Sequence, residues 1–204
     1  MLRLYDFLPS GNSYKVRLLL TQLNIPFEII EINILKGESR TAEFLSKNYN
    51  GRIPVLETEE GQFLPESNAI LFYLSKETEF FPNNSWEQAK VMQWLFFEQY
   101  SHEPNIATSR FWISILGKEN EYQDALKQKR ELGYGALAVM EEHLSNHRFF
   151  VGERYTIADI SLFAYTHVAD EGGFELTRFP AIQAWIERVK AQPKYISIDL
   201  RSLS

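Results

Sequence analysis

The sequence predicts an α/β domain of βαβ-ββα order followed by an all-helical domain. Segments typical of β-strands, short and either alternating or continuously apolar, all fall in the first third of the 204 residues. After Pro82 the apolar residues recur at helical spacing, punctuated by Gly117, Gly152, Gly172-Gly173 and Pro180. We therefore expect one domain over residues 1–80 and a second over residues 86–204.

The first half of the α/β domain is predicted to be strand, helix, strand. Residues 2–5 alternate apolar and polar side chains, as a short strand does. A polar loop over residues 9–13 leads into a helix whose apolar stripe has the spacing i, i+3, i+4 and i+7: Val16, Leu19, Leu20 and Leu23. The mostly apolar run 27–32 is typical of a strand covered on both faces.

The second half is predicted to be strand, strand, helix. Residues 55–57 and 63–64 flank the polar turn 59–62, which indicates an antiparallel hairpin. A helix follows the segment 65–68 and carries Ile70, Leu71 and Leu74. The α/β domain is thus complete before the helical patterns begin.

Charge and composition exclude several classes of function. The chain has 21 basic and 27 acidic residues, a formal net charge of −6, and both signs are scattered, which argues against nucleic acid or an anionic membrane as partner.

Cysteine is absent, so thiol chemistry must use a thiol from a ligand. His102-Glu103 has no third ligand at metal spacing, so no metal site is expected. No signal region or apolar run of about 18 residues is visible, so we expect a cytoplasmic protein.

Two short motifs make the pattern specific. Ile53-Pro54-Val55 precedes the hairpin, and Glu66-Ser67 opens the next helix. With these motifs the sequence resembles the glutathione transferase family over nearly the whole chain, in particular bacterial-type members with a serine/asparagine active-site loop. The resemblance implies a thioredoxin-like first domain, glutathione as co-substrate and no metal.

Pro54 is unusual between two apolar β-formers, because proline cannot donate a hydrogen bond to a sheet ladder. A cis Ile53–Pro54 bond explains it and would turn the backbone of Val55 outward, open to an extended ligand. The alternative is a proline on an edge strand. The resemblance implies that this segment pairs with the cysteinyl part of glutathione.

Ser67 is expected to cap the helix that begins there, where unpaired N–H groups form an anion site. The γ-glutamyl end of glutathione carries a carboxylate and an ammonium group. The resemblance assigns the carboxylate to Ser67 with the helix start, and the ammonium group to Glu66.

The loop Ser10-Gly11-Asn12-Ser13 brings polar side chains to the positive end of the first helix. Lowering a thiol pKa of about 8.5 by two units takes roughly 2.7 kcal/mol of thiolate stabilisation. Likeness to serine-type members gives this role to Ser10; likeness to an amide-using bacterial branch gives it to Asn12, with Ser13 where cysteine or serine is common. We rank Ser10 ahead of Asn12, and we interpret Tyr5 as a core residue of its strand.

The glycyl carboxylate of glutathione requires cations or hydrogen-bond donors. Lys36, Arg40 and Arg52 lie in the loops where the resemblance places such contacts, although each has the alternative of being a solvated surface charge. Ser39 stands where several family members have histidine, a departure from the family pattern.

In the helical half, Thr156 and Asp159 form a capping-box pattern, so we interpret Asp159 as structural. The resemblance places the pocket for a second, apolar substrate on the aromatic-rich helix that follows the linker. Tyr100, Arg110 and Phe111 are the candidates, although an aromatic stripe at helical spacing is also typical of a core.

Three functions follow. The first is a glutathione transferase that conjugates the glutathione thiolate to an electrophilic small molecule. The second is glutathione-dependent disulfide or peroxide reduction, which Asn12 favours. The third is a non-catalytic interaction module, since fold alone does not establish activity. The resemblance also implies a homodimer.

Overall fold

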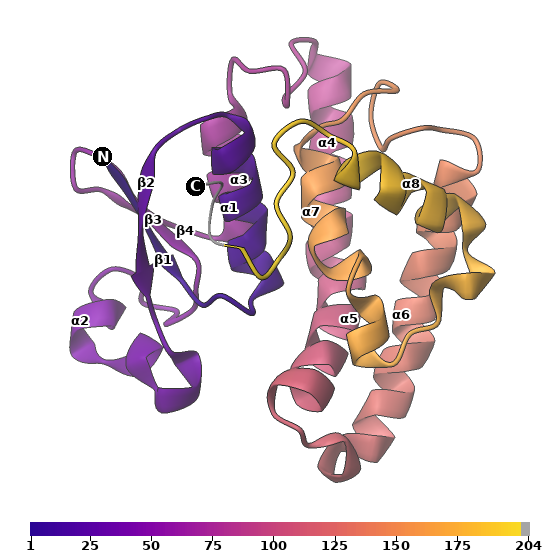
Figure 1. Cartoon of the computed structure of the whole chain (residues 1–204), viewed down its shortest axis with the longest axis horizontal. Helices are drawn as coiled ribbons and strands as arrows, with labels where there is room; N and C mark the ends of the chain where they lie inside the picture. Colours follow the sequence, from indigo (N-terminus) through magenta and orange to yellow (C-terminus); the bar gives the residue numbers. More distant parts are fainter. Residues whose placement is uncertain (201–204) are drawn as a thin grey trace. The chain divides into compact units, whose positions relative to one another are not determined.

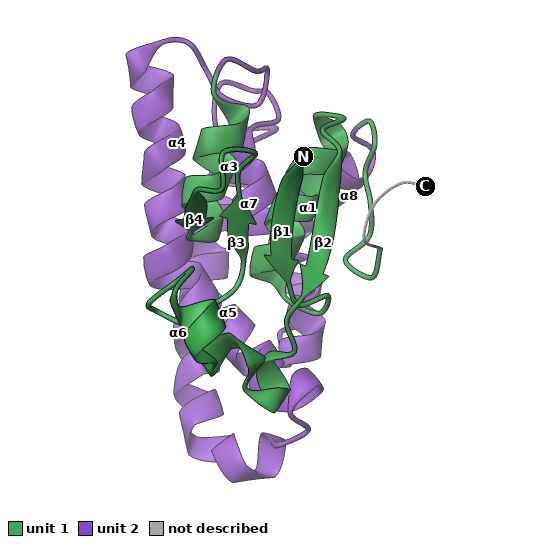
Figure 2. Cartoon of the chain, turned by 90° about the vertical axis from the view of Figure 1, so that its left-hand side faces the viewer, with its two compact units in different colours: residues 1–76, 193–204 green, residues 77–192 purple. Residues whose placement is uncertain are grey.

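The computed structural model describes residues 1–200, which divide into two compact units. Unit 1 comprises residues 1–76 together with the C-terminal segment from Pro193, and unit 2 comprises residues 77–192 (Figure 2). Each unit has its own buried apolar core. The C-terminal segment therefore belongs with the α/β unit, whereas the sequence placed it with the helices.

Unit 1 is built on a four-stranded mixed sheet of order β2-β1-β3-β4 (Figure 1). Its strands are β1 (Leu2–Asp6), β2 (Phe27–Glu31), β3 (Val55–Glu57) and β4 (Phe63–Pro65). β1 and β2 are parallel, and the pairs β1–β3 and β3–β4 are antiparallel. The predicted βαβ-ββα order and the thioredoxin-like fold are confirmed.

Helices cover both faces of this sheet. α1 (Gly11–Gln22) and α3 (Ser67–Ser75) lie side by side on one face (Figures 1 and 2). On the other face Phe44, from the short helix α2 (Ala42–Leu45), packs against Tyr5 and Val55. Because successive strand residues point to opposite faces, Leu4 and Leu56 point away from α2.

A buried ion pair joins the unit's C-terminal segment to its core. Arg17 on α1 contacts Asp6 at 2.7 Å, and both side chains are almost completely buried. The same guanidinium donates to the carbonyl of Ile198 at 2.9 Å, and the Tyr14 hydroxyl donates to the carbonyl of Ile196 at 2.6 Å. These long-range bonds, between residues more than 180 positions apart, explain why the tail belongs to unit 1.

Unit 2 is helical. Its α-helices are α4 (Ser85–Phe97), α5 (Glu103–Arg110), α6 (Gln123–Leu144), α7 (Ile157–Thr166) and α8 (Pro180–Lys190). Two π-helical turns, Glu98–His102 and Phe111–Ile115, flank α5, and 3-10 turns span Glu119–Tyr122, Ala169–Gly172 and Leu176–Arg178. Over residues 1–200, no helix has both the length and the apolar composition needed to span a membrane.

Helix α7 forms the centre of unit 2, since all ten of its residues are buried. It begins at the predicted capping box: Thr156 caps the helix, and Asp159 accepts the Thr156 N–H at 2.9 Å. Asp159 also accepts from Trp185 Nε1 at 3.0 Å and from the Phe150 N–H at 3.2 Å. The carboxylate thus satisfies buried donors from three segments, as its structural interpretation expected.

Candidate functional site

The turn before β3 contains a cis proline, one of the two alternatives that the sequence left open. The Ile53–Pro54 peptide bond is cis, and Val55 follows as the first residue of β3. Val55 is fully buried and aligned with Tyr5 on β1 and with Pro65 on β4. This differs from the expected outward-turned Val55, because neighbouring strands flank it on both sides. Ile53, before the proline, lies outside the ladder and is half-buried.

The start of α3 has an uncommon backbone. Ser67 is the first helical residue, and Glu66 holds the N-cap position that the sequence assigned to Ser67. Glu66 has a φ of 71° and makes no side-chain cap bond. A non-glycine residue held in this region costs on the order of 1 kcal/mol or more and is a frequent feature of ligand-binding sites. At this helix N-terminus the Glu66 side chain is exposed and the neighbouring Ser67 side chain is buried.

Asn12 and Ser67, 55 residues apart in sequence, lie within hydrogen-bond distance. The Ser67 hydroxyl donates to Asn12 Oδ1 at 3.2 Å. Lys15, one turn after Asn12 on α1, directs its Nζ at Ser67 Oγ from 3.4 Å and at Asn68 Oδ1 from 3.5 Å. Sequence reasoning missed Lys15, although its spacing of three from Asn12 places both on one face of α1.

Ser10 has a local structural role. It is the N-cap of α1, where its Oγ accepts the N–H of Ser13 at 3.3 Å. Ser13 is fully buried, and its Oγ has no hydrogen-bond partner among residues 1–200. Asn12, in the same loop, instead reaches the start of α3 through its hydrogen bond with Ser67.

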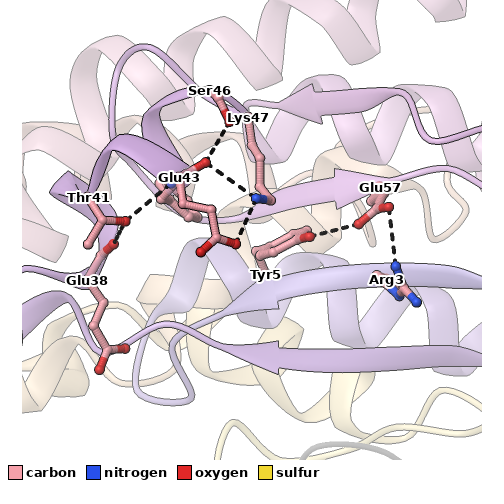
Figure 3. Close-up of polar contacts among 9 residues, drawn as sticks. Arg3, Tyr5, Glu38, Thr41, Glu43, Ser46, Lys47 and Glu57 are labelled. Atoms are coloured by element: carbon pink, nitrogen blue, oxygen red, sulfur yellow. Dashed lines mark hydrogen bonds and ion pairs between the residues drawn. The ribbon is translucent and has the colours of Figure 1, made fainter.

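Tyr5 is part of the core, as its position in the strand predicted. Its hydroxyl donates to Glu57 Oε2 at 2.8 Å, and Lys47 lies over its ring at 5.6 Å (Figure 3). Its ring also meets Phe44 and Phe63 edge to face. Burial, together with the hydrogen bond to Glu57, raises the pKa of Tyr5 to about 12. Tyr5 therefore keeps its proton at neutral pH and gives its hydrogen bond to Glu57.

The cations expected to meet a glycyl carboxylate lie on the segment between β2 and β3. Lys36, Arg40 and Arg52 are all exposed. Arg40 donates to the carbonyl of Asn50 at 2.9 Å and packs so closely on Gly51 that a Cβ there would lie 2.6 Å from its Nη1. Arg40 thus braces this loop, while Lys36 and Arg52 have solvent-facing side chains.

The three candidates for a second-substrate pocket lie on consecutive helical segments of unit 2. Tyr100 is 87% exposed, and Phe111 is half-buried. Arg110 is 6% exposed and forms an ion pair with Glu171 at 2.7 Å. Within residues 1–200, His, Cys, Asp and Glu side chains form no cluster of three that could hold a metal ion.

Unit 1 has a mixed four-stranded sheet, a cis proline before β3 and a positive φ at the N-cap of α3, which are features of a thioredoxin-like domain. In this chain an all-helical domain follows it. The chain belongs to the glutathione S-transferase family. Residues 1–76 match the model of the glutathione S-transferase N-terminal domain, and residues 90–193 match that of the C-terminal domain.

Solved structures and curated relatives agree with this assignment. A glutathione S-transferase from Pseudomonas fluorescens is 48% identical, with a TM-score of 0.95 over 97% of this chain and 98% of that chain. A glutathione transferase family member from the same species, with two glutathione bound, is 27% identical, with a TM-score of 0.81 over 94% and 89% of the two chains. The disulfide-bond oxidoreductase YfcG of Escherichia coli is 28% identical over 200 residues, 95% of this chain and 92% of its own.

Proposed function

We propose that the protein is a glutathione-dependent enzyme that binds reduced glutathione in unit 1 and stabilises its sulfur as a thiolate. One observation carries the proposal: Asn12 from the α1 loop and Ser67 from the start of α3 are within hydrogen-bond distance, on the fold of a glutathione-binding relative. The backbone N–H groups at a helix N-terminus suit an anionic ligand.

Each end of glutathione then has a partner in unit 1. The N–H groups at the start of α3, beginning with that of Ser67, hold the γ-glutamyl carboxylate, and the exposed Glu66 carboxylate holds the ammonium group. The backbone around Ile53–Pro54 pairs with the cysteinyl residue, with Ile53 favoured over Val55 because it lies outside the sheet ladder. Lys36 and Arg52 are the candidates for the glycyl carboxylate, since Arg40 braces the loop.

For the thiolate we now favour Asn12 over Ser10. The Ser10 hydroxyl, which caps α1, has one O–H donor, whereas the Asn12 amide has two N–H donors besides the oxygen that accepts from Ser67. A hydrogen bond to a charged group contributes about 1.5 to 3 kcal/mol. That is the scale needed to lower a thiol pKa by one to two units.

The thiolate supports conjugation directly. Its sulfur forms a bond to an electrophilic carbon, and the electron pair displaced from that carbon leaves with a halide or takes up a proton. The protein supplies thiolate stabilisation and positioning, so no covalent intermediate with the protein is required. Tyr100 and Phe111 are the apolar candidates on the second-substrate side, whereas Arg110 is already committed to Glu171.

Disulfide reduction is the second candidate, favoured by the relative YfcG and by the absence of cysteine. Here one glutathione thiolate attacks the glutathione sulfur of a mixed disulfide, which releases the other thiolate and forms oxidised glutathione. The site needs no protein cysteine for this exchange.

We also infer that the protein is a homodimer, which light scattering on the purified protein tests.

The deciding experiment is calorimetric titration with reduced glutathione near pH 7, followed by an ultraviolet scan of the same sample for thiolate. Binding with a thiolate signal supports the proposal, and assays with aryl halides, enones, peroxides and mixed disulfides then separate conjugation from reduction. No binding at millimolar glutathione would overturn it in favour of an interaction module.

A further inference from the structure

Lys15 is a fully buried lysine at the fifth residue of α1. Its Nζ is directed at the start of α3, 3.4 Å from Ser67 Oγ, and Ser67 Oγ in turn lies 3.2 Å from Asn12 Oδ1. Removing a lysine from water is unfavourable unless its hydrogen bonds are replaced. A buried lysine in line with two residues of the proposed site therefore requires a functional explanation.

We infer that Lys15 is a positioning residue that fixes the direction of the hydrogen-bond chain from Lys15 through Ser67 to Asn12. A lysine ammonium group has three donors and no acceptor, so Ser67 Oγ must accept from it. Ser67 has a single hydroxyl hydrogen, and it donates this hydrogen to Asn12. The atom of Asn12 that faces Ser67 must then be the oxygen.

The consequence concerns the other half of the Asn12 amide. Oxygen and nitrogen occupy opposite arms of a planar group, so an oxygen held toward Ser67 turns Nδ2 the other way. Without Lys15, the Ser67 hydroxyl could equally accept a hydrogen bond, so its contact with Asn12 would no longer require the amide oxygen on this side. Lys15 thus favours one of two orientations that have nearly the same shape.

This selection deepens the proposed function, on which it rests. A thiolate requires a donor, and an amide oxygen in the same place would repel it. Because each donor in a chain polarises the next, the Lys15 charge also strengthens the N–H donors of Asn12. Lys15 therefore lowers the pKa of the bound thiol by acting through Asn12, while the N–H groups of α3 hold the γ-glutamyl carboxylate.

The first test uses the ligand-free protein. The side-chain NH2 signals of Asn12 are recorded by NMR and assigned by their loss in Asn12→Ala. In Lys15→Met these signals should shift and broaden as the amide samples both orientations, whereas Lys15→Arg should restore a single sharp pair. Lys47→Met is the matched control, because Lys47 pairs with Glu43 on α2 and lies outside the chain.

Unchanged Asn12 signals in folded Lys15→Met would overturn the inference, whether or not the protein binds glutathione. Should Lys15→Met not fold, Ser67→Ala removes the middle link with a smaller loss of volume. Its Asn12 signals should change in the same way, and unchanged signals would again refute the chain.

The second test is a double-mutant cycle on the pKa of glutathione's bound thiol, followed by thiolate absorbance. Lys15→Met should raise this pKa by about one unit, the scale of one charge-assisted hydrogen bond, and should have no effect in the Asn12→Ala background. An equal rise in both backgrounds would show that Lys15 acts by charge alone, which overturns the inference but leaves the proposed function intact. Wild-type protein that binds no glutathione would overturn the proposed function, and the NMR signals alone would then decide the inference.

Discussion

Replacing Asp159 should lower the stability of unit 2, because this one carboxylate accepts hydrogen bonds from several buried donors. Its Oδ1 accepts from Phe150 N and Trp185 Nε1, and its Oδ2 accepts from the N–H and the hydroxyl of Thr156. All these residues are buried. Asp159→Ala leaves four donors unsatisfied, each costing about 1 to 3 kcal/mol before relaxation. Because neighbouring losses are not additive, we expect about 4 kcal/mol in total, the scale of breaking a buried charged network.

Asp159→Asn should cost about half as much, since one oxygen keeps its two donors while the amide nitrogen faces the other two. The assay is urea unfolding at pH 7 followed by tryptophan fluorescence. All four tryptophans, Trp86, Trp94, Trp112 and Trp185, belong to unit 2, so the signal reports this unit. Asp124→Asn, at an exposed position of α6, is the control.

Two results would refute this reasoning. One is a loss for Asp159→Ala no larger than that of the control. The other is an Asp159→Asn variant as unstable as Asp159→Ala, which would mean that the charge matters rather than the individual donors.

The remaining predictions concern pH and glutathione. Burial raises the pKa of Asp159 from 3.8 to about 6, so the stability it contributes is complete below about pH 4 and declines as the pH rises through about 6; Asp159→Asn should lack this decline in urea titrations at pH 4 to 7. Burial lowers the pKa of His167 from 6.5 to about 4, so its contribution to stability is complete above about pH 6.5 and is lost as the pH falls toward 4. His167→Phe should therefore lose less stability than the wild type over that range, and the same dependence of stability on pH in both proteins would contradict this assignment. Glu66→Gln should weaken glutathione binding about 10-fold or more by calorimetry, the scale of one charged hydrogen bond, yet should not weaken a glutathione analogue that lacks the γ-glutamyl amino group. Asn12→Ala should raise the pKa of the bound thiol by more than Ser10→Ala does; the reverse order, measured by thiolate absorbance, would restore Ser10 as the thiolate donor.

The local order of unit 1 could be predicted from the sequence because it depends on short-range patterns. Alternating and continuous apolar runs located the strands within a residue or two, and the stripe from Val16 to Leu23 located α1. Pro54 between β-formers left a cis bond and an edge-strand proline as alternatives, and the structure has the cis bond. Thr156 and Asp159, three residues apart, likewise identified the start of α7.

Other features depend on which distant residues meet. Arg17 and Tyr14 donate hydrogen bonds to the carbonyls of Ile198 and Ile196, which attach the C-terminal segment to unit 1. No local sequence pattern near either end of the chain predicts these bonds. Val55 was expected to face a ligand, but its register places a strand on each side.

The site itself shows the same division. The sequence, through its motif spacing and its family resemblance, supplied Ser10, Asn12, Glu66 and Ser67 as candidates, with Ser10 ranked ahead of Asn12. Only the tertiary structure brought Asn12 and Ser67 within 3.2 Å and placed the buried Lys15 behind them. A charged residue beside an apolar helix stripe looks solvated in a sequence, and its burial is decided by the packing of α1 against α3.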